Sequence, residues 1–223
     1  MGFASPHAAR EMYSRAAWTI AFAVVVYFIN RAEYPGPAAT LAVVITLIGV
    51  ALAGIGYSLH WIATEGRKAV YAQIGNGLNL QGAERVLSLS HDLGIEVAQQ
   101  LKSGKVISLG DTAANEAARE SAKNQGLIDR IRFESGDLTT KLSYPDANFD
   151  LILSSQALTD VDRDKALREL LRVLKPGGSL TIHESSDITS FERPLRDAGV
   201  SSVTNTPTPL PLGLGGRILT ATK

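Results

Sequence analysis

The stretch that decides the fold is residues 149–183, which read FDLILSSQALTDVDRDKALRELLRVLKPGGSLTIH. Its first part, Phe149–Ser154, is an apolar run of strand length. A helical pattern follows over Asp162–Leu174, and the residues Lys175-Pro-Gly-Gly178 end it. A second apolar run covers Ser179–His183. A strand, a helix and a second strand in this order predict a parallel βαβ unit.

The same alternation extends to both sides of this unit. Further strands are predicted at 85–89, 105–109, 130–134, 200–204 and 217–222, and further helices at 95–101, 113–125 and 191–198. Strands separated by helices of about ten residues indicate a doubly wound sheet. The fold class expected for residues 82–223 is therefore α/β, with a mainly parallel, seven-stranded, doubly wound sheet.

Two apolar stretches precede this domain. Residues 16–30 hold no charged side chain, and residues 36–64 hold no Asp, Glu, Lys or Arg. As helices they would measure about 22 Å and about 44 Å, against a hydrocarbon core of about 30 Å. Between them, Arg31–Pro37 contains two prolines and a glycine, which predict a turn. We therefore expect a transmembrane helical hairpin within residues 1–64.

The charges that flank the hairpin predict its orientation. Two arginines precede the first stretch, Arg67 and Lys68 follow the second, and Arg31 lies in the turn. This bias favours the cytosolic side for both outer ends. A cleaved signal peptide and a pair of buried core helices are the alternatives. The expected protein is a two-pass integral membrane protein, in which residues 65–81 form an amphipathic helix and linker to a cytosolic α/β domain.

The composition excludes several kinds of function. The chain has 22 basic and 22 acidic residues, so it has no cationic excess with which to bind nucleic acid. It has no cysteine, which excludes disulfides, thiolate metal sites and a cysteine nucleophile. The acidic segment Asp160–Asp164 does not predict a metal site, because Asp162 is placed to cap the following helix. We expect no bound metal.

The topology directs attention to four strand ends. Ligands of doubly wound sheets bind at the carboxyl ends of the strands, near the point where the strand order reverses. An acidic residue after the second strand suits ribose hydroxyls, and an Asp after the third can accept from an exocyclic amine. A nucleoside-like ligand is therefore expected. The candidate cofactor-binding residues are Ser90, Gly94, Asp111, Asp137, Leu138 and Ser154.

Several of these segments resemble a known family. Gly136-Asp137, Pro145-Asp146 and residues 166–179 (ALRELLRVLKPGGS) look like the class I S-adenosylmethionine-dependent methyltransferases of the methyltransferase domain 11 type. The resemblance covers about residues 82–223, and members with a two-helix hairpin in front look similar over the whole chain. It implies a Rossmann-like fold and S-adenosylmethionine as cofactor. For a membrane-anchored methyltransferase we expect a small lipophilic acceptor. Because methyl transfer from a sulfonium depends mainly on positioning, no catalytic residue is predicted.

The first loop departs from the family's pattern of Asp-x-Gly-x-Gly-x-Gly. Residues 88–94 read SLSHDLG, so Ser90 and Asp92 carry side chains where the resemblance implies bare backbone beside the cofactor. Three possibilities stay open: a membrane-anchored methyltransferase, an inactive methyltransferase-like scaffold tethered to a membrane, or a cleft that binds a different ligand. His91 and His183 can be general bases, but a loop imidazole and a solvated strand end explain them more simply. The sequence does not indicate an oligomeric state.

Overall fold

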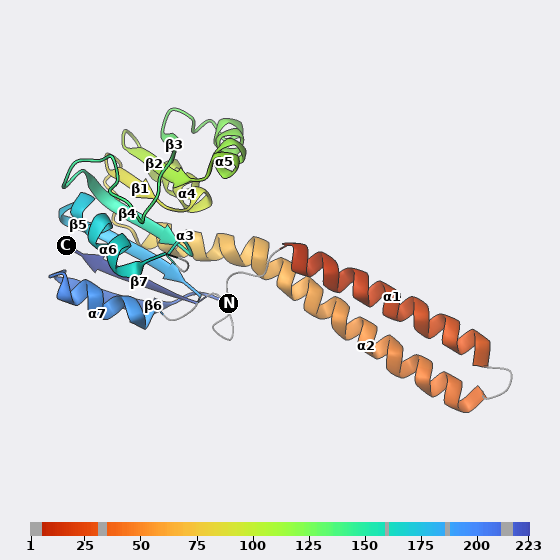
Figure 1. The fold of residues 1–223 in the computed structure, drawn as a ribbon. Coiled ribbons are helices and arrows are strands. Elements are labelled where there is room, and N and C mark those ends of the chain that lie inside the picture. The colour runs from red at the N-terminus through yellow and green to blue at the C-terminus, as the bar shows by residue number, and fades with distance from the viewer. Residues whose placement is uncertain (1–5, 31–34, 159–160, 186–187, 211–215) are drawn as a thin grey trace. The chain divides into compact units, whose positions relative to one another are not determined.

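The computed structural model describes residues 6–30, 35–158, 161–185, 188–210 and 216–223. Its contacts divide the chain into two compact units with a boundary between Lys68 and Ala69. The first unit is a helical hairpin and the second is an α/β unit (Figure 1).

The hairpin consists of α1 (Pro6–Asn30) and α2 (Pro35–Trp61), which lie side by side, and a π-helical turn, Ile62–Gly66. The predicted pair of helices is confirmed. However, α2 begins at Pro35, so the Pro-Gly-Pro segment forms its first turn rather than the connection. Proline fits there because the first amide groups of a helix have no partner within it. The rest of the predicted turn, 31–34, lies outside the described residues.

The prediction that the two helices cross a membrane is not confirmed. Over the residues that the structure describes, no helix reaches the length and hydropathy of a membrane span. In α1, one physical reason is that Arg10, Glu11 and Arg15 occupy the first part of the helix, which leaves the apolar segment 16–30.

The α/β unit is built around one sheet of seven strands in the order β3-β2-β1-β4-β5-β7-β6. All neighbouring strands are parallel except β7, which runs antiparallel to both β5 and β6. The order reverses between β1 and β4, which places a switch point there. The predicted seven-stranded, mainly parallel sheet is confirmed. The strands are β1 (Arg85–Ser88), β2 (Lys105–Gly110), β3 (Ile131–Ser135), β4 (Phe149–Ser155), β5 (Leu174–Glu184), β6 (Ser202–Pro207) and β7 (Arg217–Thr222).

Helices lie on both sides of the sheet (Figure 1), as a doubly wound fold requires. Their bounds are α3 (Arg67–Gly77), α4 (His91–Gln100), α5 (Thr112–Asn124), α6 (Arg163–Val173) and α7 (Thr189–Asp197). The hydrophobic core joins Leu167 of α6 and Phe191 of α7 to Ile152, Leu180 and Leu219 of the central strands. Burial of these side chains is the main stabilising contribution to the unit.

The two glycines of the turn after α6 have different roles. Gly177 has a left-handed backbone, with a φ of +76°, but Gly178 does not share that conformation. A Cβ at Gly178 would lie 2.7 Å from Leu174 Cδ1 and 3.0 Å from the Asp150 carbonyl oxygen. Gly178 is therefore needed for close approach rather than for its φ. The β4–β5 register shifts at this point, so the turn is an irregularity within β5.

Helix α3 contacts the sheet rather than serving only as a connection. Its residues Val70, Tyr71 and Ile74 are buried, and the Tyr71 hydroxyl lies 3.3 Å from Ser155 Oγ at the end of β4. Residues 75–77, which read Gly-Asn-Gly, form the last turn of this helix. The contact between α3 and β4 positions the carboxyl end of β4.

Candidate functional site

A cleft of about 640 Å³ lies at the carboxyl ends of β1 to β3, beside the residues that follow β4. Its position is the one that a doubly wound sheet uses for ligands. Three predicted residues, Asp111, Asp137 and Leu138, line it, whereas Ser90, Gly94 and Ser154 do not. The other lining residues are Leu89, Leu109, Gly110, Thr112, Ser135, Gly136 and Ala157.

Asp111 has a structural role at the rim of this cleft. It is the N-cap of α5, and its Oδ1 accepts a hydrogen bond of 2.8 Å from the Ala114 amide. An acidic N-cap satisfies a free amide and interacts favourably with the helix dipole. The same carboxylate lines the cleft, so one residue can fix the start of α5 and present negative charge to a ligand.

Asp137 is exposed, with its carboxylate held in a local turn. Its Oδ1 accepts hydrogen bonds from Thr139 Oγ1 at 2.7 Å and from the Thr139 amide at 2.8 Å. These two bonds hold the pKa of the Asp137 carboxyl below its usual value. The carboxylate is therefore ionised at neutral pH, and its orientation is fixed before any ligand binds.

The remaining predicted residues pack the first loop instead of lining the cleft. Ser90 precedes α4, and its carbonyl accepts from the Gly94 amide at 2.9 Å and from Ser88 Oγ at 2.7 Å. Gly94 is buried, and a Cβ there would lie 3.1 Å from that of Ser88, so this glycine allows α4 to approach β1. Ser154 is fully buried, and its Oγ has no hydrogen-bond partner in the described structure.

His91 is the residue of this region that sequence reasoning underestimated. It is the first residue of α4, not a loop imidazole, and its Nδ1 lies 2.7 Å from Ser108 Oγ on β2. Its ring packs edge to face on Phe133, with centroids 5.5 Å apart. A Cβ at Gly110 would overlap His91 Nε2, so the imidazole occupies the space that a side chain at position 110 would fill.

This packing also determines the charge of His91. Burial lowers the pKa of the imidazole, and the nearby carboxylates of Asp92 and Asp111 oppose that effect. The neutral ring is therefore favoured at neutral pH. In the sequence, the only sign of this contact is that position 110 is glycine and position 91 is histidine. The two residues become neighbours because β1, which precedes His91, pairs with β2, which ends at Gly110.

His183 is not a solvated strand end, as the sequence suggested. It is fully buried near the end of β5, and its Nδ1 lies 2.9 Å from Ser155 Oγ, which in turn lies 3.3 Å from the Tyr71 hydroxyl. Gln156, the residue after Ser155, has a φ of +55°, which is unusual for a residue other than glycine. The Gln156 amide donates to the His183 carbonyl at 2.9 Å. These contacts fix the turn that leads to Ala157 in the cleft.

Comparison with known proteins agrees with this geometry. Residues 94–182 match the methyltransferase domain family. The chain is 38% identical over 109 residues to the ubiquinone/menaquinone biosynthesis C-methyltransferase UbiE of Pectobacterium atrosepticum, covering 46% of this chain and 43% of that protein. It is 32% identical over 114 residues to the methyltransferase GfsG of Streptomyces halstedii, covering 49% of this chain and 41% of the relative. The chain thus spans less than half the length of these relatives.

Solved structures show the same fold. A putative O-methyltransferase of Nostoc punctiforme has a TM-score of 0.61 at 21% identity, over 72% of this chain and 58% of its own. The [4+2]-cyclase SpnF has a TM-score of 0.57 at 22% identity, over 69% of this chain and 79% of its own. The α/β unit therefore has the Rossmann-like methyltransferase fold. Because a cyclase shares it, the fold alone does not define the reaction.

Proposed function

We propose that the α/β unit is an S-adenosylmethionine-dependent methyltransferase. The observation that carries this proposal is the cleft at the carboxyl ends of β1 to β3, in a segment that matches the methyltransferase domain family. Two carboxylates, Asp111 and Asp137, and the apolar Leu138 line it. Its volume of about 640 Å³ is in the range of small-molecule sites.

These residues fit the nucleoside part of the cofactor. Asp111 and Asp137 offer acceptors for hydroxyl and amine groups, and Leu138 offers an apolar surface for a base. When bound, S-adenosylmethionine supplies a methyl group already activated by a sulfonium. The chain's own contribution is then to bind, to orient and to exclude water, which requires no dedicated base.

Calorimetry of the full chain in mild detergent, with S-adenosylmethionine and S-adenosylhomocysteine, tests the proposal. We expect binding of both, and we expect Asp137→Ala to weaken it by about fivefold or more, because a ligand amine loses its acceptor. Asp197→Ala, which removes an exposed aspartate of α7, is the matched control. If the parent chain binds neither ligand, the proposed methyltransferase activity is excluded.

The alternative is an inactive scaffold with this fold. Two observations favour it: Ser90 and Asp92 replace glycines of the family's loop, and His91 fills the space beside Gly110. The variant Ser90→Gly with Asp92→Gly separates the two functions. A scaffold that has lost its site gains cofactor binding from these changes, whereas an enzyme that already binds gains nothing.

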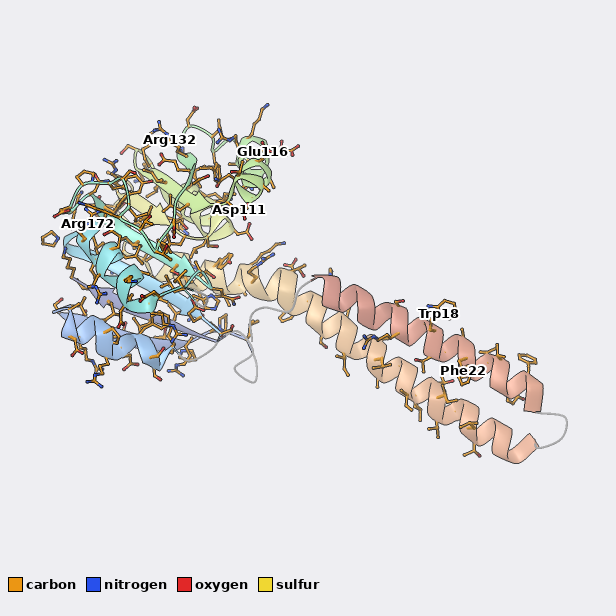
Figure 2. All side chains as sticks on the ribbon, viewed as in Figure 1. Trp18, Phe22, Asp111, Glu116, Arg132 and Arg172 are labelled. Carbon is orange, nitrogen blue, oxygen red and sulfur yellow. The ribbon has the colours of Figure 1, made fainter. Side chains whose placement is uncertain are left out.

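We further propose that the hairpin holds the protein at a lipid bilayer. Its packing is the inverse of that in a soluble protein, because small residues meet between the helices and large apolar residues face outward. Ala16 and Ala23 of α1 and Gly49 and Gly56 of α2 are buried. In contrast, Trp18 is 75% exposed, Leu47 63% and Phe22 61% (Figure 2 labels Trp18 and Phe22). Contacts between small residues are typical of helices that pack within lipid.

A membrane location has two consequences for the proposed activity. The acceptor would be a small lipophilic molecule reached from the bilayer, and the relatives named for ubiquinone and menaquinone biosynthesis support this class. The α/β unit would lie on the cytosolic side, where Arg67 and Lys68 follow the hairpin. Protease digestion of sealed, right-side-out vesicles tests the orientation: protection of residues 69–223 is expected, and their digestion would place the unit on the opposite side.

A further inference from the structure

A second cavity, of about 620 Å³, lies at the opposite ends of β1, β2 and β3 from the cleft. Residues 103–104 and 128–130, which precede β2 and β3, line it. We call it the basic groove. Five basic residues and two acidic ones line it, although the chain as a whole has no net charge. The basic residues are Arg85, Lys105, Arg119, Arg130 and Arg132, and the acidic ones are Glu84 and Asp129.

The cations of the basic groove lie in a row across the sheet. Arg85 is directly opposite Lys105 in the register of β1 and β2. Arg130 continues this row, because Val106 is opposite Ile131 in the next pair of strands. Like charges directly opposite each other destabilise a sheet. A bound anion would remove that repulsion.

Few of these cations have an internal counter-charge. Lys105 Nζ donates to the Asp129 carbonyl, which is a neutral partner. Arg132 lies 3.9 Å from Glu134, whose carboxylate also accepts from the Tyr144 hydroxyl at 2.7 Å. Within the described part of the chain, Arg85, Arg119 and Arg130 form no ion pair. The Arg85 guanidinium does have an aromatic contact, because it lies over the Phe149 ring, 5.5 Å from the centroid. The groove therefore presents guanidinium groups that remain available to an anion.

Apolar groups lie next to this charge. Ile107 and Ile128 line the same groove, and Ile128 is 41% exposed. A ligand that fits both features carries an anionic group and an apolar part. Such a ligand is present at high local concentration if the same chain is held at a bilayer, because a tethered site meets the lipid surface intramolecularly.

We propose that the basic groove binds the phosphate headgroup of an anionic phospholipid. The proposal rests on the proposed membrane location and not on methyl transfer. Phosphate pairs well with guanidinium groups, which offer several donors in a fixed plane. Binding would hold the α/β unit against an anionic surface at a site separate from the cleft; Figure 2 labels Arg132 and Asp111, which belong to the groove and the cleft respectively.

Hydrogen exchange of the full chain in lipid nanodiscs tests this. Two compositions are compared: phosphatidylcholine alone, and phosphatidylcholine with phosphatidylglycerol. In the anionic discs, the amides of residues 103–107 and 128–133 should exchange more slowly by about fivefold or more. This factor corresponds roughly to the binding free energy that one basic residue contributes near an anionic surface. High salt should abolish the difference, since it screens exposed charges.

Two double variants locate the effect. Arg130→Gln with Arg132→Gln should remove the slowing, whereas Arg193→Gln with Arg196→Gln, which removes two exposed arginines of α7, should keep it. Equal exchange in both kinds of disc would overturn the proposal. So would equal slowing by inorganic phosphate in detergent, which would assign the groove to a soluble anion.

The same samples separate this proposal from the others. Protection of the α1 and α2 amides in both kinds of disc reports the membrane location, and calorimetry with S-adenosylhomocysteine reports the cleft. If the hairpin amides are unprotected, the lipid assignment fails together with the membrane location. If only cofactor binding fails, the lipid assignment stands.

Discussion

At the scale of single residues, the contact of His91 with Gly110 is the most specific feature beside the cleft. The imidazole of His91 is held by Ser108 at 2.7 Å and lies against Gly110. The ring can take this place only because position 110 has no side chain. The identity of one residue therefore depends on the other, although they are 19 positions apart in the chain.

This dependence predicts a double-mutant result. Gly110→Ala should lower the free energy of unfolding by about 1 to 3 kcal/mol, because its Cβ overlaps the His91 ring. In a His91→Ala background the same change should cost much less, since the ring is gone. Urea unfolding of the full chain in mild detergent, followed by circular dichroism, measures all four proteins. Equal costs in the two backgrounds would show that the ring does not occupy this space.

The burial of His91 predicts a pH dependence. Its folded pKa lies below the ordinary value of 6.5, mainly because burial disfavours the charged ring. Between the two pKa values the unfolded chain binds more protons, so this stabilising contribution is complete above pH 6.5 and declines as the pH falls through the folded pKa. His91→Gln should therefore lose less stability than the parent between pH 7 and about pH 5. Parallel slopes for the two proteins would contradict the prediction.

At the scale of elements, Arg172 of α6 holds the loop between the cleft and β4. Its guanidinium donates to Glu169 Oε1 at 2.6 Å, to Asp146 Oδ1 at 2.5 Å and to the Tyr144 carbonyl at 3.0 Å. It also reaches the Leu142 carbonyl at 3.2 Å. A single side chain (labelled in Figure 2) therefore organises the segment that begins at Leu138 in the cleft.

Replacement of Arg172 should loosen this loop. We expect Arg172→Ala to cost about 1.5 to 3 kcal/mol, the effect of losing hydrogen bonds to a charged group that is mostly buried. Arg172→Lys should restore little, because a lysine cannot reach several acceptors in one plane. Hydrogen exchange over residues 138–148 should rise in both variants. Arg168→Ala, which changes an exposed arginine of the same helix, should leave the loop unchanged.

The alternation of strands and helices could be predicted because it follows from local patterns. Each predicted strand from 85 to 222 corresponds to an observed one, since short apolar runs and helical periodicity are properties of neighbouring residues. The contacts of the site could not be predicted from such local patterns. Whether Ser154 or Ser155 reaches a partner depends on which face of β4 each occupies, and on α3 supplying Tyr71 from more than eighty residues away. The burial of His183 was missed for the same reason.

At the scale of the whole molecule, the chain combines two units that differ in which side chains they bury. The α/β unit buries its large apolar side chains, such as Phe149 and Phe191. The hairpin buries mainly small residues and exposes its large ones. A Cβ at Gly49 would lie 2.6 Å from Ile20 Cγ1, so close contact of α1 with α2 depends on glycine. An exposed surface of this composition is the observation behind the proposed contact of the hairpin with lipid.

The last prediction uses this surface to distinguish lipid from water. Phe22 and Leu47 are 61% and 63% exposed, so a lysine at either position would meet no steric obstacle. If lipid covers the hairpin, each lysine near the centre of the bilayer costs about 2.5 to 3.5 kcal/mol. Phe22→Lys with Leu47→Lys should then lower the fraction of protein that resists carbonate extraction from membranes. If water covers the surface instead, the same charges should increase solubility without other effect. Arg193→Lys with Arg196→Lys, on α7, provides the control for handling and expression, because it leaves the charge and the hairpin unchanged.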